Sequence, residues 1–310
     1  MRATCDTVAA SGAMVSGQVT SRDVDAGDHR LRVYTCGDRV LPAVVLVHGS
    51  GPGVSAPSNW EHLLPVFAEA GYFAIAPDVL GFGDSEHPDP APAGGMPEYT
   101  DLRATSLIAL LDALGIDKAH FIGNSMGGMI SLRIAQIAPE RVDRMILMGS
   151  GGAPMKPTDD LMRLITFYDD PSPEAMAGLL IRFVDNTDLF AGKLDQIAAD
   201  RAAKANRPDV RRSHLATFNP AFSPVGYSEE ALAQIKNETL VLHGREDRML
   251  PVRAGYYLAE NLPNSQLHVL PHAGHWIQIE QAERFVEQAK LFLGEPSTLP
   301  SNRRTRQDNT

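Results

Sequence analysis

The sequence has few cysteines and no long hydrophobic run. Cys5 and Cys36 are its only cysteines, too few for a disulfide framework, which favours a reducing cytoplasm. No apolar stretch approaches the roughly 20 residues that span a bilayer. The first twenty residues also lack the continuous apolar segment of a signal peptide. We therefore expect a cytoplasmic protein.

Basic residues are outnumbered, and metal-binding clusters are missing. The 310 residues carry 38 acidic and 28 basic side chains, a net charge of −10. This balance argues against nucleic acid or an anionic membrane as the main partner. No clustered spacing of His, Cys and carboxylate residues suggests a metal site. We expect neither kind of partner and no bound metal.

Apolar residues, 44% of the chain, fall into short runs that alternate with helical patterns. The continuous hydrophobicity of these runs is typical of strands covered on both faces, as in a parallel sheet. "DLRATSLIALLDALGI" and "MISLRIAQIAPERV" have apolar residues at helical spacing. The alternation predicts an α/β fold, a mostly parallel twisted sheet flanked by helices. The predicted strands are 43–49, 72–78, 119–124, 144–150, 239–244 and 266–271.

One region breaks this alternation. From about residue 155 to 225 the chain is helix-like, contains no clear buried strand, and has Pro and Asp clusters. An inserted helical cap is the simplest interpretation. The predicted division is a flexible tail at 1–17, a core at 18–154 and 226–295, a cap at 155–225 and a second flexible tail at 296–310.

A single serine stands between glycines in "FIGNSMGGMI", residues 121–130. A serine hydroxyl is a good nucleophile only when a neighbouring base takes its proton, so it must stand clear of the backbone. A sharp turn from strand to helix achieves this, and Gly123 and Gly127 remove side chains that would collide there. The pattern G-x-S-x-G is the nucleophile elbow of α/β-hydrolases, here with Ser125 at its centre.

The acid and the histidine of a serine triad follow the nucleophile in that order in this fold. Asp247 lies just past one predicted strand and His275 just past the next. We assign Asp247 to hold the imidazole and His275 to transfer the proton. Glu246 competes for the first role and His272 for the second.

A tetrahedral intermediate also needs donors for its oxyanion. The backbone N–H of Met126, directly after the nucleophile and at a helix N-terminus, is one candidate. The other comes from "HGSGPG", where glycines let the backbone approach the substrate. We assign it to the N–H of Ser50, with Gly51 as the alternate. His48 in this loop is interpreted as a structural anchor.

Together these motifs resemble the meta-cleavage product hydrolases. These are serine-triad α/β-hydrolases that cut a carbon–carbon bond in vinylogous 1,5-diketones from aromatic ring cleavage. The resemblance rests on "VHGSGPGVSAPSNW", "GNSMGG", "LHGREDRMLP" and "LPHAGHWIQIE", and runs from about residue 30 to 294. It is densest in the core motifs and thin in the cap.

The resemblance assigns roles by position. It implies that Ser125, Asp247 and His275 form the triad and that Ser50 and Gly51 lie in the oxyanion loop. The remaining positions that it marks as substrate contacts are Asn59, Asn124, Trp276 and the cap arginine Arg201. It also implies an enzyme without metal or organic cofactor, in a homodimer or larger homo-oligomer.

Several of these assignments have rivals. Arg207, Arg211 and Arg212 lie near Arg201 and compete to hold the substrate carboxylate. Asn124 could equally stabilise the turn. Pro57 stands where relatives often carry another residue, which affects the placement of Asn59.

The implied reaction is hydrolysis of the C5–C6 bond of a 6-substituted 2-hydroxy-6-oxo-hexa-2,4-dienoate, a small-molecule substrate. The alternative is a carboxylesterase or lactonase with the same triad. Dehalogenases and epoxide hydrolases use an Asp nucleophile, whereas position 125 is Ser. A ligand-binding receptor on this fold would not need the triad. The stretches "LMRLITFYDD" and "GLLIRFVDN" hold residues that can line an apolar pocket, but leave the C6 substituent open.

Overall fold

A computed structural model describes residues 17–221 and 226–296, which form a sheet flanked by helices. Within these residues the sheet has eight strands in the order β1-β2-β4-β3-β5-β6-β7-β8. The strands are β1 Thr20–Ala26, β2 His29–Cys36, β3 Ala43–Val47, β4 Phe73–Pro77, β5 Ala119–Asn124, β6 Val142–Met148, β7 Glu238–Gly244 and β8 Ser265–Leu270. From β4 to β8 the neighbouring strands pair in parallel.

The predicted α/β fold is confirmed, and all six predicted strands are present. The hairpin of β1 and β2, in which β2 pairs antiparallel with both β1 and β4, was not predicted. In β1 only Val24 and Ala26 are buried, because this strand lies at the edge of the sheet. A strand of mostly polar residues lacks the continuous apolar run that marks the central strands.

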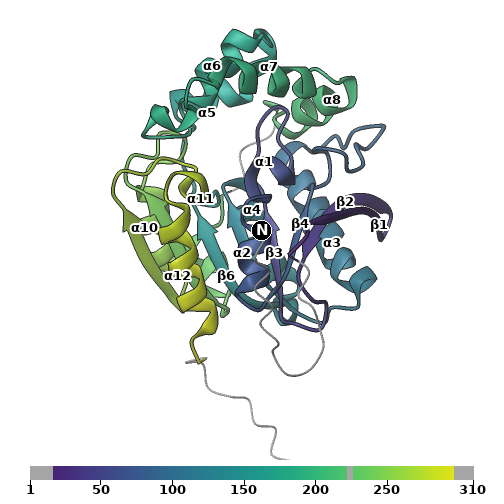
Figure 1. The fold of residues 1–310 in the computed structure, drawn as a ribbon, viewed down its shortest axis with the longest axis vertical. Helices are drawn as coiled ribbons and strands as arrows, with labels where there is room; N and C mark the ends of the chain where they lie inside the picture. Colours follow the sequence, from purple (N-terminus) through teal and green to yellow (C-terminus); the bar gives the residue numbers. More distant parts are fainter. Residues whose placement is uncertain (1–16, 222–225, 297–310) are drawn as a thin grey trace, which may run out of the picture.

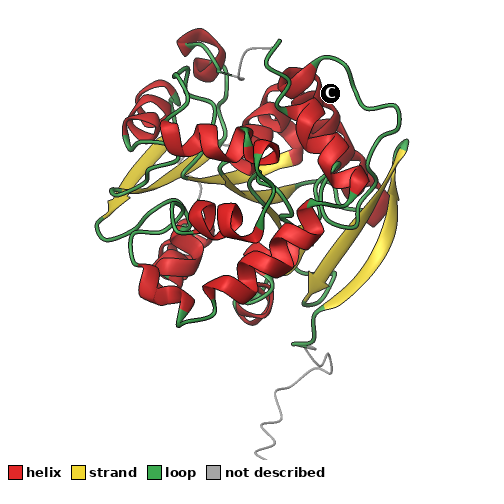
Figure 2. Ribbon diagram, turned by 90° about the horizontal axis from the view of Figure 1, so that it is seen from above, coloured by secondary structure: helices red, strands yellow, loops and turns green. Residues whose placement is uncertain are grey.

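Helices cover both faces of the sheet (Figure 2). One apolar core includes side chains of α3, α4 and α10, and the other includes those of α2 and α12. The α-helices are α1 Ala56–Trp60, α2 Leu64–Glu69, α3 Gly95–Leu114, α4 Met126–Ile137, α5 Asp159–Ile165, α6 Pro173–Leu180, α7 Leu194–Ala205, α8 Pro208–Thr217, α9 Glu229–Ala233, α10 Arg253–Asn261, α11 Ile277–Glu280 and α12 Ala282–Gly294. Short 3₁₀ turns lie at η1 Pro139–Arg141, η2 Phe167–Asp169 and η3 Thr187–Phe190.

Helices α5 to α8, which we call the cap helices, arch over one end of the sheet (Figure 1). They have an apolar core of their own, which also takes in Met249 and Trp276 from the loops after β7 and β8. The cap helices fall within the cap predicted at 155–225, and the exact division into cap and core stays a prediction. The predicted tails lie almost wholly outside the described residues.

Candidate active site

Ser125 occupies the sharp turn between β5 and α4, with φ 55° and ψ −117°. Positive φ at a residue other than glycine is strained, at a cost of about 1–3 kcal/mol. A Cβ atom at Gly123 would overlap the main chain of Gly127, and one at Gly127 would overlap the carbonyl oxygen of Val47. The glycines of the motif therefore permit a close approach of β3, β5 and α4, and this packing holds the serine in its strained turn.

Asp247 and His275 form a buried pair beyond the ends of β7 and β8. The Nδ1 atom of His275 lies 2.7 Å from Oδ2 of Asp247, while Oδ1 accepts the amides of Met249 and Leu250 at 2.9 Å each. Burial by itself raises the pKa of Asp247, but the imidazoles of His275 and His243 outweigh it and lower the pKa to about 2. Asp247 is therefore a carboxylate at neutral pH. It holds the proton of His275 on Nδ1 and leaves Nε2 to accept another.

Asn124 connects the nucleophile turn to the histidine loop. Its Nδ2 atom donates to the carbonyl oxygens of His275 at 3.2 Å and Met148 at 3.0 Å. No hydrogen bond joins the Ser125 hydroxyl to the imidazole in the described part of the chain; such bonds often tighten only when substrate is bound. The Nδ2 atom of Asn124 therefore stabilises the turn, while its Oδ1 atom is buried without a described hydrogen-bond partner, and contact of Asn124 with substrate stays a prediction.

The two rivals for the triad lie in the same loops without joining the pair. His272 is exposed and has φ 57°, and its carbonyl accepts a hydrogen bond from Gln281. Glu246 accepts the amide of Ala273 at 3.1 Å. Neither side chain takes part in the Asp247–His275 hydrogen bond, so the geometry favours the original assignment.

The proposed oxyanion donors lie next to the nucleophile. Ser50 and Met126 line the same cavity as Ser125. Met126 is the first residue of α4, so its N–H has no acceptor within the helix. Gly51 has φ 148°, and a Cβ atom there would lie 3.1 Å from Nη2 of Arg201. Ser50 thus shares a cavity with Ser125, whereas Gly51 packs against the cap arginine.

His48 has the geometry of a structural anchor. Its Nε2 accepts the amide of Val79 at 3.0 Å, so the ring proton is on Nδ1, which donates to the carbonyl of Gly49 at 2.7 Å. Burial lowers the pKa of His48 to about 4, so the ring is neutral at physiological pH. Both nitrogens are engaged, which agrees with the predicted anchoring role.

The cavity in front of Ser125 is apolar and has a volume of about 290 Å³. Every described residue that lines it is uncharged. Methionine is prominent in the lining, with Met96, Met126, Met129, Met155 and Met162. Such flexible thioether side chains adapt to irregular shapes and make favourable contacts with aromatic rings. We call this space the Ser125 cavity.

Arg201 reaches from α7 onto the oxyanion loop. Its Nε donates to the carbonyl of Pro52 at 3.0 Å, and its guanidinium lies 5.6 Å from the ring centre of Trp276. Arg201 and Trp276 together line a second cavity, of about 340 Å³. Burial lowers the pKa of Arg201 to about 10, which leaves it charged at neutral pH. Among the described residues no carboxylate forms an ion pair with Arg201.

The other arginines of the cap have partners already. Arg207 pairs with Asp84 and Asp209 at 2.9 and 2.7 Å. Arg212 lies 3.3 Å from Asp89. The guanidinium of Arg211 lies 5.3 Å from the ring centre of Tyr168. Only Arg201, of these four, combines a site-facing position with the lack of a described counterion.

Asn59 is buried in α1, and its amide donates to Ser55 and Ser58 in the same turn. It lines neither cavity. Its contact with substrate stays a prediction.

Phe183 was not singled out from the sequence, although it lies in one of the apolar cap stretches. Its ring stacks on Trp276 at 4.4 Å between centroids and lies 5.7 Å from the ring of His275. No local motif marks such a residue, because the contact depends on how the cap meets the histidine loop.

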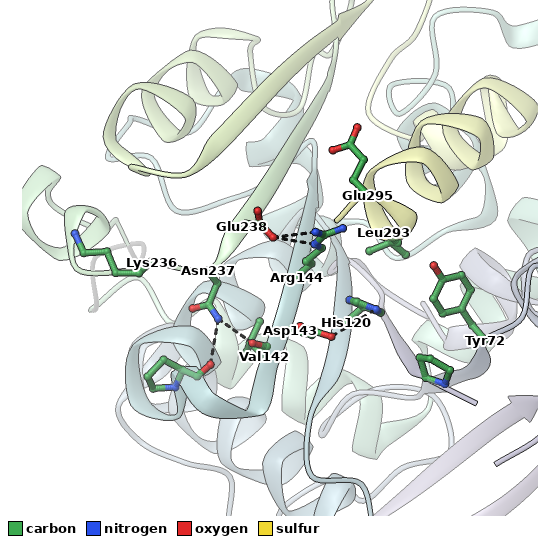
Figure 3. Close-up of a pocket in the computed structure, with 12 residues that line it drawn as sticks. Tyr72, His120, Val142, Asp143, Arg144, Lys236, Asn237, Glu238, Leu293 and Glu295 are labelled. Carbon is green, nitrogen blue, oxygen red and sulfur yellow. Dashed lines mark hydrogen bonds and ion pairs between the residues drawn. The ribbon is translucent and has the colours of Figure 1, made fainter. Parts of the chain in front are cut away.

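A larger cavity, of about 580 Å³, shares no lining residue with the Ser125 cavity. Figure 3 shows residues that line it. It is lined by residues at the amino ends of β5, β6 and β7, whereas Ser125 and Asp247 follow carboxyl ends. Its polar groups pair with one another: Arg144 lies 3.0 Å from Glu238, and His120 lies 3.9 Å from Asp143. Size alone therefore does not identify the reactive site.

Comparisons with known proteins show the family to which the chain belongs. The profile described as alpha/beta hydrolase fold matches residues 42–282, so the chain belongs to that fold family. The chain is 38% identical over 258 residues to a 2-hydroxymuconate semialdehyde hydrolase of Pseudomonas sp. (strain CF600), covering 81% of this chain and 87% of that protein. It is 37% identical over 302 residues to a 2-hydroxy-6-oxononadienedioate/2-hydroxy-6-oxononatrienedioate hydrolase of Paraburkholderia phymatum (strain DSM 17167 / CIP 108236 / LMG 21445 / STM815), covering 94% and 99%.

A solved structure shows the same relationship. The 2-hydroxy-6-oxo-6-phenylhexa-2,4-dienoate hydrolase from Rhodococcus sp. strain RHA1 superposes with a TM-score of 0.85 at 35% identity, covering 89% of this chain and 99% of that chain. The chain therefore belongs to the meta-cleavage product hydrolase family.

Proposed function

We propose that this enzyme hydrolyses the C5–C6 bond of a 6-substituted 2-hydroxy-6-oxo-hexa-2,4-dienoate. The proposal depends on a serine-hydrolase site occurring together with an arginine that has no ion-pair partner among the described residues. The strained turn at Ser125 and the buried Asp247–His275 pair are the parts of a serine hydrolase, and Arg201 adds a half-buried cation with no described counterion. Family membership supports the same reaction class.

The mechanism begins with the dienoate held by its carboxylate. Tautomerisation of the dienol to the keto form makes C5 a competent carbon leaving group. Ser125 then attacks the C6 carbonyl while His275 takes its proton, and the amides of Ser50 and Met126 stabilise the oxyanion. The C5–C6 bond breaks, and its electrons pass through the C3–C4 double bond onto the C2 oxygen. That oxygen takes the proton held by His275, and 2-hydroxypenta-2,4-dienoate leaves. Water, activated by His275, hydrolyses the acyl-Ser125 ester to release the acid.

Arg201 is proposed to hold the substrate carboxylate. A planar guanidinium can grip a carboxylate through two hydrogen bonds, each worth about 1.5–3 kcal/mol when charge-assisted. Trp276 would stack beside this end of the substrate.

The test of this role compares Arg201→Ala with the matched variant Arg207→Ala, whose arginine already has partners. Arg201→Ala should lower kcat/KM for a dienoate by roughly 10- to 150-fold per bond lost. Arg207→Ala should leave it close to wild type. The readout is loss of the yellow dienolate absorbance.

A neutral ester assayed in parallel separates the carbon–carbon hydrolase from the carboxylesterase or lactonase alternative. The proposed reaction is wrong if Arg201→Ala leaves the rates of ester and dienoate hydrolysis both close to wild type. It is also wrong if the wild-type protein does not remove the yellow colour of any C6-substituted dienolate. A Ser125→Ala variant should bind dienoate but turn it over several orders of magnitude more slowly.

The Ser125 cavity points to an uncharged C6 substituent. The two named curated relatives differ in this group yet are almost equally similar to the chain, so identity does not decide it. An apolar cavity of about 150 Å³ is enough to bind benzene, so 290 Å³ accommodates an aryl group. Arg103 does not line the cavity. It is fully buried and already donates to Leu80 and to Thr217, which does line the cavity. A second substrate carboxylate would therefore be left unpaired in the cavity.

A substituent series tests this. The phenyl-substituted dienoate should have a kcat/KM at least about 100-fold above that of a carboxyethyl analogue, since burying an unpaired charge costs several kcal/mol. The aldehyde, with hydrogen at C6, should fall between them. Preference for the carboxyethyl analogue would contradict the apolar assignment.

Two further predictions concern the cellular location and the oligomeric state of the enzyme. None of the described helices is long and apolar enough to cross a membrane. We place the protein in the cytoplasm because its two cysteines give no disulfide framework. A homodimer or larger homo-oligomer is expected from the family resemblance, and light scattering of the purified protein tests it.

A further inference from the structure

The loop that carries His275 rests on the cap. The amides of His275 and Trp276 donate to a single carbonyl oxygen, that of Phe183, at 2.7 and 3.1 Å. Phe183 belongs to the segment 183–186, which follows α6 and precedes η3. A Cβ atom at Gly274 would lie 2.7 Å from the same carbonyl, so this glycine is needed for the close approach. The main chain of the base is thus bonded to the cap.

A carboxylate completes this junction. One oxygen of Glu280, at the end of α11, accepts the amides of Asp185 and Asn186 at 2.7 and 3.0 Å. Its other oxygen accepts the amide of Gly274 at 2.6 Å. Glu280 therefore joins the cap segment to the residue immediately before the base. The mechanism above gives this side chain no role.

We propose that Glu280 is a positioning residue that ties His275 to the cap, so that the base is aligned with Ser125 only while the segment 183–186 is docked. The inference rests on the proposed function only in naming the reaction that the base serves. The cap is then part of the machinery that places the base, in addition to enclosing the substrate.

Only a carboxylate fits this position. Three N–H groups converge on the side chain and need acceptors on both of its oxygens. A glutamine offers one oxygen and turns an NH₂ group toward the remaining donors, so one side of the junction is released. Burial raises the pKa of Glu280, and the neighbouring carboxylate of Asp185 adds to this, while the three amides oppose it.

The consequence for catalysis is a loss of alignment with little loss of binding. Ser125 and Asp247 are held by core elements and do not depend on this junction. A misplacement of a catalytic group by about 1 Å can cost on the order of 10²-fold in rate. Substrate contacts at Arg201 and in the Ser125 cavity are left intact, so KM should change little.

The experiment compares Glu280→Gln with Glu283→Gln, which removes the same charge from an exposed residue three positions along the chain, at the start of α12. Two rates are measured: dienoate turnover, and covalent labelling of Ser125 by a small fluorophosphonate, which needs the base but no cap contact. Amide hydrogen exchange is followed at Gly274 and at 185–186. Labelling separates this inference from the carbon–carbon chemistry, because it works whatever the natural substrate is.

In Glu280→Gln we expect both kcat and the labelling rate to fall about 10- to 100-fold, with KM unchanged and faster exchange on at least one side of the junction. Glu283→Gln should match wild type. If Glu280→Gln does not fold, Glu280→Asp serves instead, since its shorter side chain cannot reach both sides. Wild-type labelling in a folded variant whose Gly274 amide exchanges faster would overturn the proposal. So would a rise in KM with kcat unchanged.

Discussion

Replacing Asp247 with Asn tests the assignment of the triad. The carboxylate accepts three hydrogen bonds, from the His275 ring and the amides of Met249 and Leu250. The asparagine oxygen can keep the two amides, and its NH₂ group would then face Nδ1 of His275. This arrangement moves the ring proton to Nε2, the atom that accepts the proton of Ser125 in the proposed mechanism.

The expected loss of kcat follows from the wrong tautomer of the His275 imidazole. In serine proteases the equivalent change lowers kcat by about 10⁴-fold while the geometry is preserved. We expect a loss of the same order here, close to 5.5 kcal/mol in activation free energy at 1.36 kcal/mol per tenfold. Turnover is followed by the dienolate absorbance, and a denaturant titration shows whether the variant is folded.

The matched control is Glu246→Gln, the same chemical change one residue earlier. Glu246 accepts only the amide of Ala273, a bond that a glutamine oxygen can keep, so we expect activity within tenfold of wild type. Should a folded Asp247→Asn variant retain kcat within tenfold, or should Glu246→Gln be the more damaging change, the reasoning from the hydrogen bonds is refuted.

Three further changes test the packing and the charges around the site. A Cβ at Gly149 would lie 3.1 Å from both Asp247 Oδ2 and His275 Nδ1, so Gly149→Ala should lower kcat about 10- to 100-fold in steady-state assays. Gly127→Ala forces a methyl group into the neighbouring strand and should lower the free energy of unfolding by about 1–3 kcal/mol in urea titrations. Burial raises the pKa of Asp78 to about 6. Because the native state then holds this proton more tightly than the unfolded chain, the contribution to stability is full below about pH 4 and is lost as the pH rises through 6. Asp78→Asn should therefore flatten the pH dependence of the unfolding midpoint between about pH 4 and 7, measured calorimetrically.

The central strands and the nucleophile turn were predictable because their signals are local. Strands buried on both faces need continuous apolar runs, and the strained turn needs glycines at fixed offsets from Ser125. The hairpin of β1 and β2 gave no such signal, because an edge strand buries few side chains. The position of His275 just past a predicted strand was also a local signal, and the structure pairs His275, not His272, with Asp247.

Other features of the site depend on contacts between residues that lie far apart in the chain, and no local sequence pattern indicates such contacts. Four arginines of the cap look alike in the sequence, and Arg201 is distinguished by combining a contact with the oxyanion loop with the lack of a described counterion. The apolar character of the Ser125 cavity arises from methionines that lie far apart in the chain. The amide of Asn124 could be assigned to main-chain carbonyls only once the histidine loop was placed beside it.

The three members of the proposed triad differ in what holds them, and this difference has a consequence for specificity. Ser125 is fixed by the packing of two strands and a helix, and Asp247 by two amides of its own loop. His275 depends in addition on the carbonyl of Phe183 and, through Gly274, on Glu280. A substrate that keeps the cap segment from docking would leave nucleophile and acid in place but displace the base. Poor substrates should then bind and acylate slowly, so discrimination would be expressed in kcat, as binding energy is used to assemble the site.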